Sequence, residues 1–144
     1  MPATDNAALA RRWFDDIWNQ RRDETAHELL DREAVGHLEG LTTRGIDEFF
    51  VARSYIITAF PDFRIEVEDT VADGEDVVVR WSGTGTHRGM LMDVPPTGTT
   101  VNVRGLTWLR FAHGRIVEGW DAWNQGAMMA DLRAAASGRA TAHG

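Results

Sequence analysis

The chain has 144 residues, 43% of them hydrophobic, and a net charge of −7, which fits a single domain and argues against nucleic acid or an anionic membrane as a partner. No run reaches the length of a transmembrane helix and the N-terminus does not resemble a signal peptide, so we expect a cytoplasmic protein. Because there is no cysteine and all 15 cationic side chains are Arg, thiol chemistry, disulfides and lysine Schiff bases are excluded, and acid–base work by Asp, Glu, His or the single Tyr55 remains.

The first half of the chain has the patterns of helices with one short strand. Apolar residues recur every three or four positions between Leu9 and Trp18, which predicts an amphipathic helix. Asp23 is suited to cap a second helix, and Pro61 ends a third. The expected elements are helices over Asn6–Gln20, Asp23–Asp31 and Ile46–Ala59, a strand over Ala34–Leu38, and a Gly- and Thr-rich loop over Gly40–Gly45.

The second half changes to a period of two, which is typical of strands with one buried face. Helices first and an antiparallel sheet afterwards predict an α+β fold. We expect one domain over residues 1–136 and a flexible tail over Ser137–Gly144. The expected elements are strands Phe63–Val67, Val77–His87, Val101–Phe111 and Arg115–Trp123, a turn at Ala72–Glu75, a connection over Arg88–Thr100, and a short helix over Gln125–Ala136.

The last two strands are expected to form a hairpin whose register creates a pocket. A three-residue loop, Ala112–Gly114, pairs Gly105 with Asp121 and Thr107 with Gly119. The face that then carries the carboxylate is otherwise apolar or small: Val103, Gly105, Thr107, Leu109, Val117, Gly119 and Asp121. The opposite face would be solvated or a subunit contact: Arg104, Leu106, Trp108, Arg110, Ile116, Glu118 and Trp120. A two-residue loop would instead place Asp121 with Arg104 and Arg110 on the surface.

Asp121 is the strongest candidate for chemistry. It lies between Trp120 and Trp123 at the end of a strand, where poor hydration should raise its pKa toward the range useful for proton transfer. Gly105 and Gly119 beside it would leave room for a ligand, whereas a plain core would be filled. The alternative is that Asp121 caps the last helix or pairs with an Arg.

Several further residues could contribute to the site, each with a structural alternative. His37 is a candidate catalytic partner, and His87, on the same strand face as Trp81, would lie at the mouth of the cavity; either could instead be a hydrogen-bonded structural histidine. The substrate-contact candidates could also be core residues, helix caps or partners of the backbone: His87, Trp81, Thr107, Trp120, Trp123, Tyr55, Gly105 and Asn124.

A metal site is a weaker alternative. His37-Leu38-Glu39 has the spacing of a two-His-one-carboxylate iron site, with His87 or His113 as the distal ligand, but such a tripeptide is common by chance. We therefore expect no metal. His27, His113 and His143 are interpreted as surface residues.

Short motifs spread from about Leu9 to Leu132 are similar, in their order and spacing, to those of the SnoaL-like polyketide cyclase family. The motifs are Phe60-Pro61-Asp62-Phe63, Val67-Glu68-Asp69, Val79-Arg80-Trp81, Gly85-Thr86-His87-Arg88-Gly89, Pro95-Pro96-Thr97-Gly98 and the segment from Gly114 to Asp121. The resemblance implies the nuclear transport factor two-like fold, a curved antiparallel sheet wrapped by helices into a cone, and a homodimer formed through the sheet.

The resemblance also implies a reaction, with Asp121 as general acid and base in a cofactor-free intramolecular aldol closure of polyketide antibiotic biosynthesis. The family's cyclases use a His on the adjacent strand where this chain has Thr107, and Asn124 is similar to members linked to hydroxylation.

We therefore expect a cofactor-independent acid–base enzyme acting on a hydrophobic, carbonyl-bearing small molecule. The alternatives are a polyketide tailoring enzyme (a hydroxylase, hydratase or epoxide hydrolase) and a non-catalytic binding module. Epoxide opening would require a second carboxylate and an Arg near Asp121, which the predicted pocket face lacks.

Overall fold

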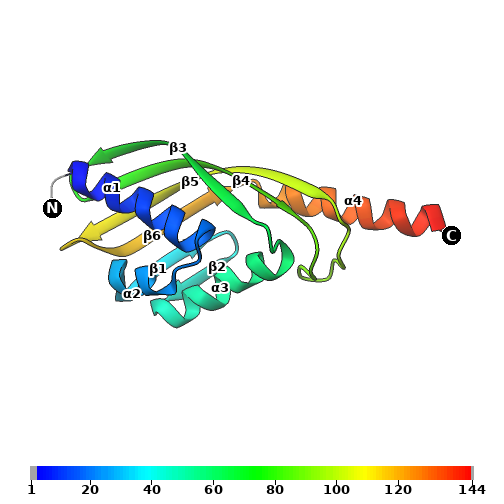
Figure 1. The fold of residues 1–144 in the computed structure, drawn as a ribbon, viewed down its shortest axis with the longest axis horizontal. Helices are drawn as coiled ribbons and strands as arrows, with labels where there is room; N and C mark the ends of the chain where they lie inside the picture. Colours follow the sequence, from blue (N-terminus) through cyan, green and yellow to red (C-terminus); the bar gives the residue numbers. More distant parts are fainter. Residues whose placement is uncertain (1–2, 144) are drawn as a thin grey trace.

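The computed structural model describes residues 3–143, with side chains described for residues 5–138, and has the expected α+β class. Figure 1 shows a curved, unclosed sheet with helices against one side and a C-terminal helix that extends away from it. The elements are α1 (Ala3–Phe14), π-helix η1 (Asp15–Asn19), α2 (Asp23–Leu29), β1 (Leu30–Leu38), β2 (Leu41–Arg44), α3 (Gly45–Ala59), β3 (Arg64–Asp73), β4 (Asp76–Thr86), β5 (Thr100–Ala112), β6 (Arg115–Trp123) and α4 (Gln125–His143).

The sheet has six strands in the order β2-β1-β6-β5-β4-β3. All neighbours are antiparallel except β1 and β6, which run parallel with Gly36 opposite Gly119 and His37 opposite Trp120. Helix α1 packs against β3 and β4, and α3 packs against β1 and β2. The sheet therefore curves around an interior that the helices cover.

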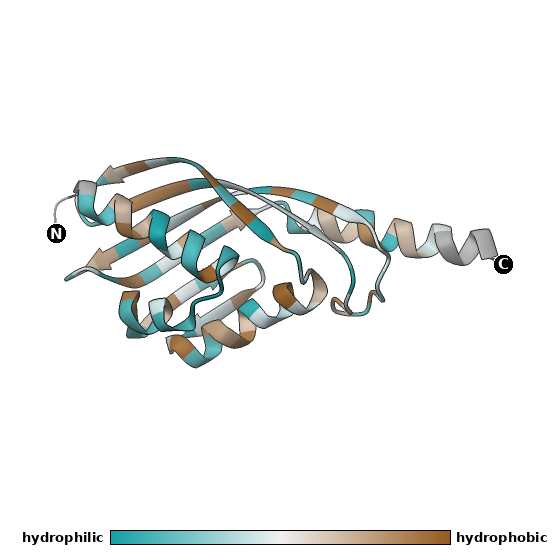
Figure 2. Cartoon of the chain, in the orientation of Figure 1, coloured by the Kyte–Doolittle hydropathy of each residue, from teal (hydrophilic) through white to brown (hydrophobic). Residues whose placement is uncertain are grey.

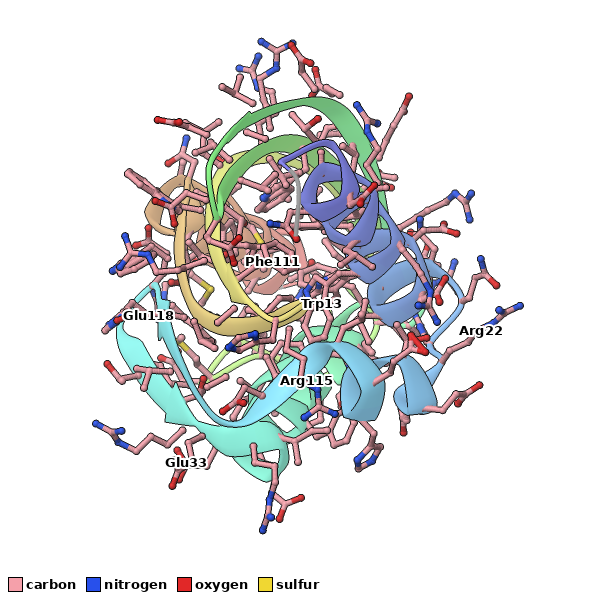
Figure 3. All side chains as sticks on the ribbon, turned by 90° about the vertical axis from the view of Figure 1, so that its left-hand side faces the viewer. Trp13, Arg22, Glu33, Phe111, Arg115 and Glu118 are labelled. Atoms are coloured by element: carbon pink, nitrogen blue, oxygen red, sulfur yellow. The ribbon has the colours of Figure 1, made fainter. Side chains whose placement is uncertain are left out.

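The alternating pattern of the strands produces this interior. Figure 2 shows hydrophobic and hydrophilic residues alternating along the strands. Figure 3, which looks at the end of the sheet, shows Phe111 and Trp13 inside the curve and Glu118 outside it. Phe111 is 1% exposed and Trp13 5% exposed, so this end of the interior is filled by core side chains. None of the described helices is long and apolar enough to cross a membrane.

Several expected boundaries differ from the structure. Strand β1 begins at Leu30, inside the predicted helix Asp23–Asp31, and not at Ala34. The predicted loop over Gly40–Gly45 contains strand β2, because a two-residue turn at Glu39 and Gly40 pairs Leu38 with Leu41 and forms a hairpin. Strand β3 extends to Asp73, well beyond Val67. Helix α4 extends through His143 where a tail was expected after Ala136; Gly144, the last residue of that tail, and the side chain of His143 lie outside what the structure describes.

The predicted register of the β5–β6 hairpin was wrong. The turn has two residues, His113 and Gly114, both with positive φ, and pairs Ala112 with Arg115. A β-bulge follows, since Phe111 pairs with Ile116 but Arg110 pairs with Glu118, so Val117 is the extra residue.

The bulge has a direct effect on the site. With the two-residue turn alone, the Asp121 side chain would lie on the outer face of the sheet. The extra residue returns it to the inner face, so Asp121 lies opposite Thr107 and both side chains are on the inner face. Ile116, expected on the outer face, is instead 3% exposed and belongs to the core.

Candidate active site

A cavity of about 520 Å³ lies between the inner face of the sheet and helices α1 and α3. Most of its wall is apolar, with contributions from Trp13 and Phe14 of α1, Phe49 of α3 and Val103 of β5. Only three of the described residues in the wall carry a charge: Glu39, Arg53 and Asp121. An apolar cavity with a few polar groups is the usual form of a small-molecule site.

Asp121 enters this cavity from β6 and is held by residues of two neighbouring strands. Thr107 on β5 donates its hydroxyl to Asp121 Oδ1 at 2.7 Å. The indole Nε1 of Trp81 on β4 donates to Thr107 Oγ1 at 2.9 Å. Trp81 and Thr107 are both buried, so the chain Trp81–Thr107–Asp121 fixes the orientation of the carboxylate from beneath.

Burial raises the pKa of Asp121 to about 6, because the ionised carboxylate is poorly solvated here. The hydrogen bond from Thr107 acts in the opposite direction, and the negative charge of Glu39 raises the pKa further. The expectation of a raised pKa is confirmed. A carboxylate of this kind can accept and return a proton near neutral pH.

The two glycines expected beside Asp121 have different roles. Gly119 lines the cavity, as expected. Gly105 does not; a Cβ there would overlap the Trp81 ring and lie 2.8 Å from Trp123 Cβ. Gly105 therefore allows the two indoles to pack closely, rather than leaving space for a ligand.

The other substrate-contact candidates are divided by the structure. Trp81, Thr107, Trp123 and Tyr55 line the cavity, and Tyr55 is 61% exposed. Asn124 is exposed and is not among the lining residues; its backbone carbonyl accepts from the Met128 amide at 3.2 Å, at the start of α4. This position agrees with its alternative interpretation as a helix-start residue.

His37 and Trp120 lie on the outer face of the sheet, away from Asp121. Trp120 alternates with Gly119 and Asp121 along β6, so it points to the opposite side. His37 stacks on Trp120 with ring centroids 5.4 Å apart, and its Nε2 lies 2.7 Å from Glu118 Oε2. The expectations that His37 joins Asp121 and that Trp120 walls the cavity are therefore not met.

His87 is fully buried and does not line the cavity, so its expected place at the cavity mouth is also not met. The backbone amide of Thr97 donates to its Nδ1 at 3.2 Å, and Thr97 Oγ1 lies 2.9 Å from the same nitrogen. These contacts fasten the long connection between β4 and β5 to the end of β4, which is a structural role.

Glu39 and Arg53 are lining residues that sequence reasoning missed. Glu39 was considered only as a metal ligand with His37. Because β1 ends at Leu38, alternation stops there, and Glu39 lines the cavity while His37 lies outside. In the part of the chain that the structure describes, no three His, Asp or Glu side chains gather as metal ligands would.

Arg53 was recognised only as part of a helix face. Its guanidinium donates to Asp23 Oδ1 at 2.6 Å and to the Ile17 carbonyl at 3.3 Å, which holds it between α3 and the segment after α1. The lining therefore does supply a second carboxylate and an arginine, contrary to the predicted pocket face.

The chain is similar to known proteins in sequence and in fold. The family model described as SnoaL-like polyketide cyclase matches residues 8–132. A candidate SnoaL-like polyketide cyclase from Jannaschia sp. CCS1 has a similar structure, with a TM-score of 0.85 and 24% identity over 92% of this chain and 94% of that one. No protein of curated function matches the chain significantly.

Two Streptomyces structures are also similar. AclR, a candidate hydroxylase from Streptomyces galilaeus, gives a TM-score of 0.81 and 25% identity over 91% of this chain and 97% of its own. IdmH, a candidate polyketide cyclase from Streptomyces antibioticus, gives 0.74 and 30% identity over 92% and 99% of the two chains. With the family model matching most of its length, the chain belongs to the SnoaL-like polyketide cyclase family.

Proposed function

We propose that the protein is a cofactor-independent acid–base enzyme that closes a ring in a hydrophobic, carbonyl-bearing small molecule by an intramolecular aldol reaction. One observation carries the proposal: the Asp121 carboxylate, hydrogen-bonded to Thr107 and with its pKa raised to about 6, lies in the wall of a large apolar cavity. The family and the likeness to IdmH support the same reaction class.

In this reaction Asp121 removes a proton from the carbon next to a carbonyl of the bound substrate. The resulting enolate carbon attacks a second carbonyl carbon of the same molecule, forming one carbon–carbon bond and leaving an alkoxide. Asp121 then returns its proton to that alkoxide, so the enzyme is unchanged. Thr107 holds one carboxylate oxygen and leaves the other for the substrate, and the apolar wall limits competition from water.

The direct test is Asp121→Asn, with Asp47→Asn on the exposed start of α3 as the matched control. Turnover of a polyketone with two carbonyls in ring-closing distance should fall at least about 100-fold in the first variant, the low end for loss of a general base, and stay unchanged in the second. Unchanged turnover in Asp121→Asn would remove Asp121 from the mechanism. Retained ligand binding without turnover in the wild type would instead favour a binding module.

Epoxide hydration is a second candidate, favoured by the presence of Glu39 and Arg53, together with Asp121, among the residues that line the cavity. Two carboxylates can activate a water and protonate the epoxide oxygen, while an arginine stabilises the developing charge. Incubation with an apolar aryl epoxide separates the two functions, because a diol product would favour hydration and recovered epoxide would favour the cyclase.

We further propose that the outer face of the sheet forms a homodimer. Leu106 and Trp108 on β5 are 49% and 45% exposed there, beside Arg110 and Glu118, which can pair with their counterparts in a two-fold contact. Light scattering should give twice the mass of the chain, and Trp108→Glu should give the monomer mass. A monomeric wild type would overturn this proposal.

A further inference from the structure

Glu39 is the second carboxylate in the wall of the cavity, and it lies in the turn between β1 and β2. Strand β1 runs parallel to β6 with His37 opposite Trp120, so the chain leaves β1 beside the stretch of β6 that carries Asp121. Glu39 follows the last residue of β1, and Gly40 after it has a φ of +72°, which turns the chain into β2.

The Glu39 carboxylate is anchored on β6 itself. The backbone amide of Trp123 donates to Glu39 Oε1 at 3.2 Å, two residues beyond Asp121. Both carboxylates and the Trp123 side chain line the same cavity. Glu39 is exposed and reaches β6 from the turn after β1, while Thr107 and Trp81 hold Asp121 from within.

The charges that face the cavity come from few elements. Strands β4 and β5 contribute only the uncharged groups Trp81 and Thr107 near Asp121, and α3 contributes Arg53 and Tyr55 to the cavity wall. The Arg53 guanidinium is ion-paired to Asp23, with 2.6 Å between Nη2 and Oδ1. His37 and Glu118 contact each other on the other face of the sheet.

We propose that Glu39 is a positioning residue for Asp121: its carboxylate, held on the Trp123 amide two residues beyond Asp121, places a second negative charge in the wall of the same cavity. The inference rests on the proposed function, in which Asp121 must hold a proton between two steps. It assigns to the turn between β1 and β2 a part in proton transfer, although Glu39 itself touches no reacting atom.

The direction of the effect follows from like-charge repulsion. Burial is the largest cause of the raised pKa of Asp121, the Thr107 hydrogen bond lowers it, and the charge of Glu39 raises it. Glu39 is exposed, so the repulsion acts partly through solvent and is weakened by salt.

Glu39→Gln tests the charge alone, because the Gln carbonyl can still accept from the Trp123 amide. The measurement is an NMR titration of the Asp121 carboxyl carbon, which needs no substrate. The pKa of Asp121 should fall by a few tenths of a pH unit or more relative to the wild type. The matched control is Glu68→Gln on β3, at the opposite edge of the sheet, which should leave it unchanged.

Salt and a second variant keep the test decisive. In the wild type the pKa of Asp121 should fall as ionic strength rises, and in Glu39→Gln it should respond less. Glu39→Ala removes both the charge and the acceptor. An unchanged titration in Glu39→Gln, with a shift only in Glu39→Ala, would assign Glu39 a purely structural role and overturn the proposal.

Failure of this inference is distinct from failure of the proposed function. If Asp121→Asn keeps turnover, the function fails whatever Glu39 does to the titration. If Asp121→Asn loses turnover but Glu39→Gln leaves both the titration and the acid limb of the kcat/KM profile in place, only the role of Glu39 fails.

Discussion

Thr107 and Asp121 lie directly opposite each other on β5 and β6, and the Thr107 hydroxyl donates to Asp121 Oδ1 at 2.7 Å. Thr107 also accepts from the Trp81 indole at 2.9 Å, so its single proton is committed to Asp121. This arrangement favours the ionised carboxylate, whereas burial favours the protonated one. The reactivity of the site depends on the balance between these two effects.

Thr107→Val should shift that balance toward the protonated form. The hydrogen bond lowers the pKa of Asp121, so its loss should raise that pKa above about 6. In the proposed mechanism Asp121 must be ionised to remove a proton, so the acid limb of the kcat/KM profile should move to higher pH. Activity should therefore fall more at pH 6 than at pH 8.

Thr107→Ser is the matched control, because it keeps the hydroxyl and removes only a methyl group. Its pH profile should overlay that of the wild type. A Val variant with an unshifted acid limb would mean that the kinetic pKa belongs to another group.

Gly105 should be required for packing rather than for binding. An added Cβ would overlap the Trp81 ring and lie 2.8 Å from Trp123 Cβ, and both indoles are held in the wall of the cavity. Gly105→Ala should therefore destabilise the protein by about 1–3 kcal/mol in urea unfolding, as overpacked cores do.

Gly126 in the first turn of α4 provides the comparison, since a Cβ there meets nothing within 4 Å. Gly126→Ala should be neutral or slightly stabilising, as expected when Ala replaces Gly in a helix. Equal stability of the two Ala variants would contradict the packing role of Gly105.

The sequence predicted much of the fold because periodicity is a local property. Strand β6 has the predicted bounds, and the inward face of β4 from Val77 to Trp81 is buried as expected. Strand β2 was missed because Gly40, Thr42 and Thr43 resemble a loop, and only pairing with β1 makes the segment a strand. Pairing between segments is not encoded in the composition of either one.

The site shows the same limit more sharply. Asp121 was predicted on the inner face through a three-residue loop, whereas the structure reaches that face through a two-residue turn and a bulge at Val117. Relative to the prediction, the shorter turn and the bulge each shift the register of β6 by one residue, and their effects on the face that carries Asp121 cancel. Glu39 could not be found by spacing, because its place depends on where β1 ends and on the parallel pairing with β6.

The raised pKa of Asp121 also has a consequence for stability. In the unfolded chain the carboxyl has its ordinary pKa of 3.8, and in the folded protein its pKa is about 6. Between these values the folded state holds more protons, so this group's contribution to stability falls as pH rises from about 4 to about 6, and it stays unfavourable above that. Asp121 therefore lowers the free energy of unfolding at neutral pH.

Asp121→Asn should remove this destabilisation, because Asn stays uncharged and its side-chain carbonyl can accept the hydrogen bond from Thr107. The variant should be more stable than the wild type by about 1–3 kcal/mol at pH 8, in line with a shift of about two units, and the difference should shrink toward zero at pH 4. Urea unfolding at both pH values measures it, and subtracting the wild type cancels the effects of the other carboxylates. Asp47→Asn should show no such pH-dependent gain. A variant that is less stable than the wild type at pH 8 would mean that the ionised Asp121 is well solvated in the folded protein, and the case for proton transfer there would be lost with it.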